Sequence, residues 1–280
     1  MSVLSIKDLC KSYGAFRLQG VSFEVQRGEI MGFIGRNGAG KTTTLKALLN
    51  LVHPDSGEVR FFGTDFAENE LEIKSRIGFV SGGADFYPRK KLRLISEVTK
   101  SFYPNWNEAE YRRLISLFAL DEEKTPAQLS AGMKLKYSLA LALSHGAELL
   151  ILDEPTSGLD PVSRDELLEI FLRLAREGVS ILFSTHITSD LDKCADRISY
   201  IRDGRIVCSM DTDSFKNRYR LVTLTEAEAE SMRPYLIGLG ITRSGVTALI
   251  DPAVADRLSI PTQAADIETI ITHLEKEGKA

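Results

Sequence analysis

The sequence has few cysteines and no long apolar run. Its three cysteines, Cys10, Cys194 and Cys208, lie far apart and form no CxxC pair. This argues against a disulfide framework or a zinc site and fits a reducing compartment. A membrane-spanning helix needs about 18 consecutive apolar residues, which the sequence lacks, and an acid, Asp8, stands where a signal peptide would have its apolar core. We therefore expect that this chain does not cross a membrane by itself.

The sequence also has no excess of charge of one sign. Its 35 lysines and arginines are balanced by 39 aspartates and glutamates, which gives a formal net charge of −4. Binding to nucleic acid through a global basic surface is therefore not expected. With 280 residues, 43% of them hydrophobic and 26% charged, the composition is that of a globular protein with one large domain or a domain with an appendage.

Short apolar runs that alternate with helical stretches predict an α/β fold. Leu4–Leu9 and Val21–Val25 are expected to be strands of an N-terminal antiparallel part. Glu29–Ile34 is a predicted buried strand, and a glycine-rich turn connects it to a helix that begins at Lys41. Two further apolar runs, Leu149–Leu152 and Ser180–Phe183, are typical of parallel strands that are buried on both faces.

The segment from about residue 85 to 145 is predicted to be a helical insert. After the predicted helix cap Asn107, four apolar residues have the i, i+3, i+4, i+7 spacing of one helix face: Tyr111, Leu114, Ile115 and Phe118. A second helix is predicted over Ala131–Ser144.

Beyond about Phe215 the pattern of strands and helices begins again. Strands are expected at Arg220–Thr225 and Gly245–Ile250, and helices at Ala227–Leu236 and Asp266–Glu277. We therefore divide the chain into a domain of residues 1–215 and a small α+β appendage of residues 216–280.

A phosphate-binding loop is predicted at the turn that precedes Lys41. The motif G-x-x-x-x-G-K-[ST] occurs there after a predicted strand and at the start of a predicted helix, as this motif requires. The backbone N–H groups of such a loop bind anions, while Lys41 is expected to reach the β- and γ-phosphates and Thr42 to bind Mg²⁺. The alternative is a glycine-rich turn with a chance lysine. The expected nucleotide-binding residues are Gly35, Arg36, Asn37, Gly38, Ala39, Gly40, Lys41, Thr42 and Thr43.

Two adjacent acids follow the predicted strand Leu149–Leu152. We expect Asp153 to hold Mg²⁺ and Glu154 to polarise the attacking water. The alternative, an acidic turn before Pro155, explains the pair less well when a phosphate-binding loop is also present.

Four further motifs follow the order seen in one family. They are Lys11-Ser-Tyr13-Gly, Leu129-Ser-Ala-Gly132-Met, Ser157-Gly-Leu-Asp160 and Ser184-Thr-His186. Together with the loop and the acids, they make residues 2–215 resemble the ATP-binding subunit of ABC (ATP-binding cassette) transporters. The resemblance implies an α/β P-loop NTPase fold with a mixed sheet, an N-terminal antiparallel part and a helical insert.

The resemblance also implies a role for each motif. Tyr13 would stack on adenine, and His186 would contact the γ-phosphate and hold Glu154 in line. Ser130 and Gly132 would cover an ATP held by a second ATPase subunit in a head-to-tail dimer, and Asp160 would communicate between the two sites. The implied reaction is ATP hydrolysis with ATP and Mg²⁺ bound.

On this basis we interpret the chain as a cytoplasmic ATPase subunit that is peripheral on the inner face of the cell membrane. Its partner would be a separate integral-membrane permease, resembling the ABC-2 type and acting in export. The alternative is a soluble ABC ATPase that acts on ribosomes or nucleic acid, although one cassette without a coiled-coil insertion argues against it. A purely regulatory nucleotide-binding module is disfavoured by Glu154 and His186.

The sequence departs from the family pattern at three positions. Gly82 stands where the family has a glutamine that ligates Mg²⁺, so we expect water or a neighbour such as Ser81 or Asp85 to replace it. The motif Leu129-Ser-Ala-Gly132-Met, which is similar to the signature of the family, has Ala131 and Met133 in place of a glycine and a glutamine. A groove for a permease helix is expected among the aromatic residues of the insert, which are Phe86, Tyr87, Phe102, Tyr103 and Trp106.

Overall fold

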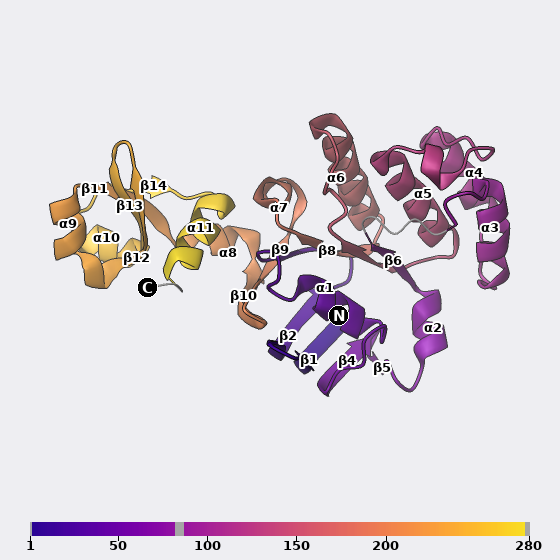
Figure 1. The fold of residues 1–280 in the computed structure, drawn as a ribbon, viewed down its shortest axis with the longest axis horizontal. Coiled ribbons are helices and arrows are strands. Elements are labelled where there is room, and N and C mark those ends of the chain that lie inside the picture. Colours follow the sequence, from indigo (N-terminus) through magenta and orange to yellow (C-terminus); the bar gives the residue numbers. More distant parts are fainter. Residues whose placement is uncertain (1, 82–86, 278–280) are drawn as a thin grey trace. The chain divides into compact units, whose positions relative to one another are not determined.

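The computed structural model describes residues 2–81 and 87–277 and has the predicted α/β architecture (Figure 1). The chain forms two compact units. One comprises Met1–Ile187 with Cys194–Ser209, and the other comprises Thr188–Lys193 with Met210–Ala280. Among the described residues, no helix combines the length and the apolar character that spanning a bilayer requires.

A six-stranded sheet lies at the centre of the first unit, in the order β10-β9-β3-β8-β7-β6. The three middle strands, β3, β8 and β7, are parallel and every residue in them is buried, which confirms the strands predicted from continuous apolar runs. The strand bounds are β3 Ile30–Ile34, β6 Ile77–Ser81, β7 Leu149–Asp153, β8 Ser180–Thr185, β9 Arg197–Arg202 and β10 Arg205–Asp211. Because parallel strands end at the same edge, the loops after β3, β7 and β8 meet there.

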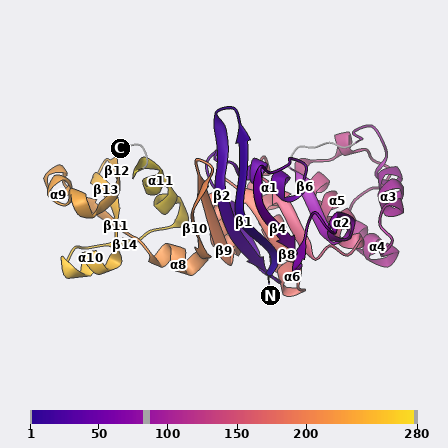
Figure 2. The same cartoon turned by 90° about the horizontal axis from the view of Figure 1, so that it is seen from below.

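The predicted N-terminal antiparallel part is a second sheet, in the order β2-β1-β4-β5. Strands β1 (Ser2–Tyr13) and β2 (Phe16–Gln26) form a hairpin that projects beyond the central sheet (Figure 2), and β4 (Ser56–Phe61) and β5 (Thr64–Asp65) complete the layer. Alternate residues of β2 are buried from Val21 to Val25, whereas β1, whose pairing with β2 shifts register, buries Val3, Leu4, Ile6 and Leu9. They pack with β3 and with helix α1 (Lys41–Leu48) into one apolar core.

The insert is helical, as predicted. It contains α3 (Leu92–Ser101), α4 (Glu108–Leu117) and α5 (Ala131–Ser144). The Asn107 side chain accepts a hydrogen bond from the Glu110 backbone N–H, and the four apolar residues of the predicted α4 face are buried, so both predictions are confirmed. Short α2 (Glu70–Ser75) precedes β6, and α6 (Pro161–Arg176) follows β7.

The second unit contains a four-stranded antiparallel sheet in the order β12-β13-β11-β14. The helix predicted at Ala227–Leu236 is wrong at its end, because α9 stops at Ser231 and Leu236 begins strand β12. Pro234 explains the difference, since proline disfavours continuation of a helix through the residues before it. The bounds are α7 Thr188–Cys194, α8 Thr212–Asn217, β11 Arg220–Leu224, α9 Glu226–Ser231, β12 Leu236–Thr242, β13 Gly245–Ile250, α10 Pro252–Arg257, β14 Gln263–Ala264 and α11 Ile267–Glu277.

Candidate functional site

The loop between β3 and α1 forms one wall of a cavity of about 410 Å³. Gly38 and Gly40 both have positive φ, at 83° and 114°, which L side chains rarely adopt. A side chain at Gly35 would collide with the Ile201 carbonyl, so the loop backbone lies directly against β9. The lining residues are Phe16, Arg36, Asn37, Gly38, Gly40, Lys41, Thr42, Thr43 and Glu154. Most of the predicted phosphate-binding residues therefore surround one cavity, and Glu154, which directly follows β7, also lines it.

Lys41 and Glu154 are in direct contact at this cavity. The Lys41 Nζ donates a hydrogen bond to the Gly35 carbonyl at 2.7 Å and lies 3.1 Å from Glu154 Oε1. The other carboxylate oxygen of Glu154, Oε2, lies 2.7 Å from His186 Nδ1. The structure thus brings together the three residues that the sequence predicted to be catalytic.

Asp153 is the last residue of strand β7, and its side chain contacts helix α1. Its Oδ1 accepts a hydrogen bond from the Thr42 hydroxyl at 3.2 Å, and the side chain is mostly buried. In the described part of the chain, no group of three or more His, Cys, Asp or Glu side chains that could hold a metal is found. A carboxylate beside a hydroxyl nevertheless fits Mg²⁺, which prefers oxygen ligands and takes only one or two from the protein when phosphates supply others.

Glu154 has an unusual backbone conformation. Its φ is 51°, in the left-handed region, which costs a non-glycine residue about 1–3 kcal/mol and persists only when the surroundings enforce it. The Ser184 hydroxyl and carbonyl oxygens accept hydrogen bonds from the Glu154 N–H, at 2.9 and 3.2 Å. The motif Ser184-Thr-His186 predicts a role for its histidine only, because the contribution of Ser184 depends on the register of β7 and β8.

Two aromatic residues lie at the turn between β1 and β2. Tyr13, the predicted adenine-stacking residue, is 45% exposed and its ring lies 5.4 Å from the Lys11 ammonium. It is not among the residues that line the cavity, whereas Phe16 is. Tyr13 and Phe16 pair directly across the hairpin, with only Gly14 and Ala15 between them. This short spacing in the sequence is the signal for Phe16 as a second aromatic residue beside Tyr13.

The signature residues begin helix α5, away from the cavity lining. Ser130 is the N-cap, and its hydroxyl accepts a hydrogen bond from the Met133 N–H at 3.2 Å. A side-chain carbon added at Gly132 would make only ordinary contacts, with Ser163 and Leu159. Packing within this chain therefore does not require glycine at that position.

Asp160 caps helix α6 rather than entering the cavity. It accepts hydrogen bonds from the backbone N–H groups of Val162 and Ser163 and from the Ser163 hydroxyl. These bonds, the Ser163 hydroxyl first among them, lower the pKa of Asp160 below its usual range. The carboxylate is exposed and remains charged.

The position of the family's glutamine, Gly82, lies outside the described residues, as do Asp85 and Phe86. Ser81 is described, and it pairs with Asp153 in the parallel ladder of β6 and β7. Its place at the strand end leaves it beside the acid that the sequence assigned to the metal.

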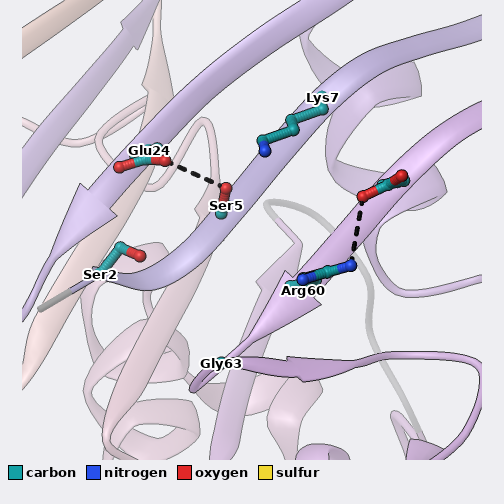
Figure 3. A pocket seen from close by; sticks show the side chains of 7 residues that line it. Ser2, Ser5, Lys7, Glu24, Arg60 and Gly63 are labelled. Carbon is teal, nitrogen blue, oxygen red and sulfur yellow. Dashed lines mark hydrogen bonds and ion pairs between the residues drawn. The ribbon is translucent and has the colours of Figure 1, made fainter.

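A second depression, of about 230 Å³, lies on the outer face of the N-terminal sheet (Figure 3). Its charged side chains are exposed, and two of its pairs satisfy each other: Ser5 donates a hydrogen bond to Glu24, and Arg60 lies 3.5 Å from Glu58. Nothing in this depression resembles the arrangement of acids, lysine and histidine at the first cavity.

Comparisons with known proteins agree with this geometry. The sequence pattern of the ABC transporter family matches residues 18–157. The chain is 35% identical to the bacitracin transport ATP-binding protein BcrA of Bacillus licheniformis, over 78% of this chain and 73% of that protein. It is 37% identical to the Nod factor export ATP-binding protein I of Burkholderia orbicola, over 73% and 70% of the two chains. A solved structure of the ATP binding subunit of an ABC transporter has a TM-score of 0.70 at 31% identity and covers 77% of this chain and 92% of its own.

Proposed function

The chain belongs to the ABC transporter family as an ATP-binding, ATP-hydrolysing subunit that powers a permease, and from this premise we propose how its residues divide the work. The observation that carries the proposal is the contact of Glu154 with both Lys41 and His186 at one cavity. In this assignment Lys41 binds the β- and γ-phosphates, and the glycine-rich loop binds them through its backbone N–H groups.

Glu154 is the proposed general base. Its carboxylate accepts the proton of the attacking water, and its hydrogen bond with His186 fixes its direction. His186 is exposed, and an N–H on its second ring nitrogen would donate a hydrogen bond to the γ-phosphate. Tyr13 and Phe16 flank the place proposed for the adenine and the ribose, where an aromatic face packs against the base.

Asp153 and Thr42 are the proposed protein ligands of Mg²⁺. When bound, Mg²⁺ neutralises charge on the phosphates. The buried carboxylate of Asp153 and the hydroxyl of Thr42 supply the oxygen atoms, and Ser81, which pairs with Asp153 in the sheet, is the described residue proposed to act in place of the family's glutamine. The prediction of an additional water at this position concerns Gly82 and stays a prediction.

We propose that two such subunits form a head-to-tail dimer around ATP. Ser130 and Gly132 lie at the N-terminus of a 14-residue helix, where N–H groups and the helix dipole favour phosphate. Neither residue lines the cavity formed by Lys41 of the same chain, and the packing of this chain does not explain the glycine. An ATP bound to a second subunit accounts for both facts.

The dimer is tested in the Glu154→Gln background, in which ATP is not consumed. ATP is expected to convert monomer to dimer in analytical ultracentrifugation, and Ser130→Arg should abolish this by filling the phosphate site. Ser101→Arg, at an exposed position of the same helical insert, is the control and should dimerise normally. An ATP-independent monomer, both alone and mixed with any neighbouring ABC ATPase, would count against the proposal.

The proposed docking surface for the permease is an apolar stripe on α3. Leu94, Val98 and Phe102 are spaced at i, i+4 and i+8 and are 41%, 48% and 74% exposed. Of the aromatic residues predicted for this role, Tyr87 is also exposed, but Tyr103 stacks on His145 and Trp106 packs against Tyr111. The latter two therefore serve the fold of the insert.

A charge on this stripe is expected to weaken permease binding. Val98→Glu should reduce co-purification with the membrane protein encoded beside this chain and remove permease-stimulated ATPase activity, while basal activity stays within about twofold. Leu117→Glu, at an exposed apolar position on α4, is the matched control. Equal loss in both variants would show a general defect of the insert and contradict the assignment. Failure of the wild-type chain to co-purify with any membrane protein would favour the alternative, a soluble ABC ATPase.

Export is the proposed direction, because the similar proteins include one named for Nod factor export. We propose a cytoplasmic location on the inner face of the membrane through the permease, with no nucleic-acid partner. In the proposed division of the chain, residues 1–215 carry the ATPase and residues 216–280 are an appendage.

A further inference from the structure

Ser184 is the last buried serine of strand β8, and it lies between the two acids of the site. It pairs with Asp153 in the parallel ladder of β7 and β8, and its side chain is fully buried. Its position in the sheet is therefore fixed by the same backbone hydrogen bonds that fix β7.

The Ser184 hydroxyl bonds to both acids at once. Its Oγ donates a hydrogen bond to Asp153 Oδ1 at 2.7 Å and accepts one from the Glu154 backbone N–H at 2.9 Å. A hydroxyl has one hydrogen, so donation to Asp153 directs its lone pairs toward Glu154. One small side chain thus sets the rotamer of one acid and the backbone of the next.

The consequences differ for the two acids. Asp153 Oδ1 also accepts a hydrogen bond from the Thr42 hydroxyl. Within the described residues, Asp153 Oδ2 makes no hydrogen bond. The two hydroxyl groups therefore hold the carboxylate through one of its oxygen atoms only. Glu154 is held in the left-handed conformation that directs its side chain to Lys41 and His186. Both arrangements depend on the same oxygen atom.

We propose that Ser184 is a positioning residue for ATP hydrolysis, which aligns the metal-binding carboxylate of Asp153 and the general base Glu154 through one hydroxyl group. This inference rests on the roles proposed above for Asp153 and Glu154. Ser184 is fully buried and is not among the residues that line the cavity, so it would act only through the two acids. Loss of a hydrogen bond to a residue that binds a metal typically lowers metal affinity or activity by about 10- to 100-fold.

Removal of the hydroxyl is expected to affect metal response and turnover but not metal-free ATP binding. Ser184→Ala should lower kcat by about 10- to 100-fold with little change in KM for ATP. In the Glu154→Gln background, it should also weaken the gain in ATP affinity on addition of Mg²⁺ by a similar factor. ATP affinity in EDTA, measured by calorimetry, should stay within about twofold, which also verifies that the variant is folded.

A pair of variants of equal volume separates the hydroxyl from packing. Ser184→Thr keeps the hydroxyl and Ser184→Val replaces it with a methyl group, so Thr is expected to recover most of the Mg²⁺ response and Val to recover none. Ser199→Ala is the matched control, because Ser199 is equally buried in β9 of the same sheet and donates to Ser209 instead of an acid. It should leave kcat and the Mg²⁺ response unchanged.

The outcomes distinguish this inference from the proposed function on which it rests. If Asp153→Asn and Glu154→Gln keep wild-type turnover, the roles of the two acids are wrong. If those variants lose turnover while Ser184→Ala keeps its kcat and Mg²⁺ response within about twofold, the positioning role of Ser184 is overturned. Equal impairment of the Thr and Val variants would also overturn it, since volume alone would then explain the effect.

Discussion

Replacement of Glu154 by glutamine is expected to lower the rate of ATP hydrolysis by about 10²- to 10⁴-fold, the usual cost of losing a general base. Glutamine has the same shape and can still hydrogen-bond to His186, but it cannot accept the proton of the attacking water. ATP affinity should fall little, because Glu154 is anionic and does not itself bind the phosphates. Single-turnover hydrolysis with saturating ATP measures the chemical step directly, and calorimetry measures the affinity.

Glu68→Gln is the control for this variant. Glu68 is exposed, and the substitution removes the same charge from a different part of the first unit. Its rate should match the wild type. A Glu154→Gln rate within about threefold of the wild type would exclude Glu154 as the base, and the contact with Lys41 would then be only an ion pair.

The elements that the sequence predicted well are those with a strong local signal. The glycine-rich loop, the cap at Asn107 and the helix Ala131–Ser144 are all set by residues close together in the chain, and the structure contains each of them. The parallel strands were recognised for the same reason, because strands buried on both faces are continuously apolar.

The elements that escaped prediction depend on distant contacts. Helix α3 buries only Leu92 and Ser96, so its apolar stripe faces outward. An amphipathic pattern in the sequence would instead predict that the apolar stripe packs on the core. Strand β12 follows directly from a turn at Pro234, and its strand pairing with β13 decides its conformation. Ser184 is one serine among many in the sequence, and only the register of β7 and β8 reveals that it lies beside Asp153.

The second large effect is expected for Lys41. Its ammonium is almost fully buried, and it is held by the Gly35 carbonyl at 2.7 Å and by Glu154 at 3.1 Å. A buried cation placed beside backbone N–H groups that bind anions provides positive charge for the β- and γ-phosphates. Hydrogen bonds to charged groups contribute about 1.5–3 kcal/mol each, so Lys41→Ala is expected to weaken ATP binding by about 10- to 150-fold.

Lys46 provides the matched control, since it is an exposed lysine on the same helix α1. Lys46→Ala should change ATP affinity less than twofold, whereas Lys41→Ala should lose affinity for ATP much more than for adenosine, which has no phosphates. The comparison of ATP with adenosine separates the loss of a phosphate contact from a collapse of the loop, because a collapse would lower the affinity for both ligands equally. Undiminished ATP affinity in Lys41→Ala would mean that the backbone of the loop binds the phosphates without the lysine. The lysine would then serve chiefly to hold Glu154, and its loss would reduce turnover rather than binding.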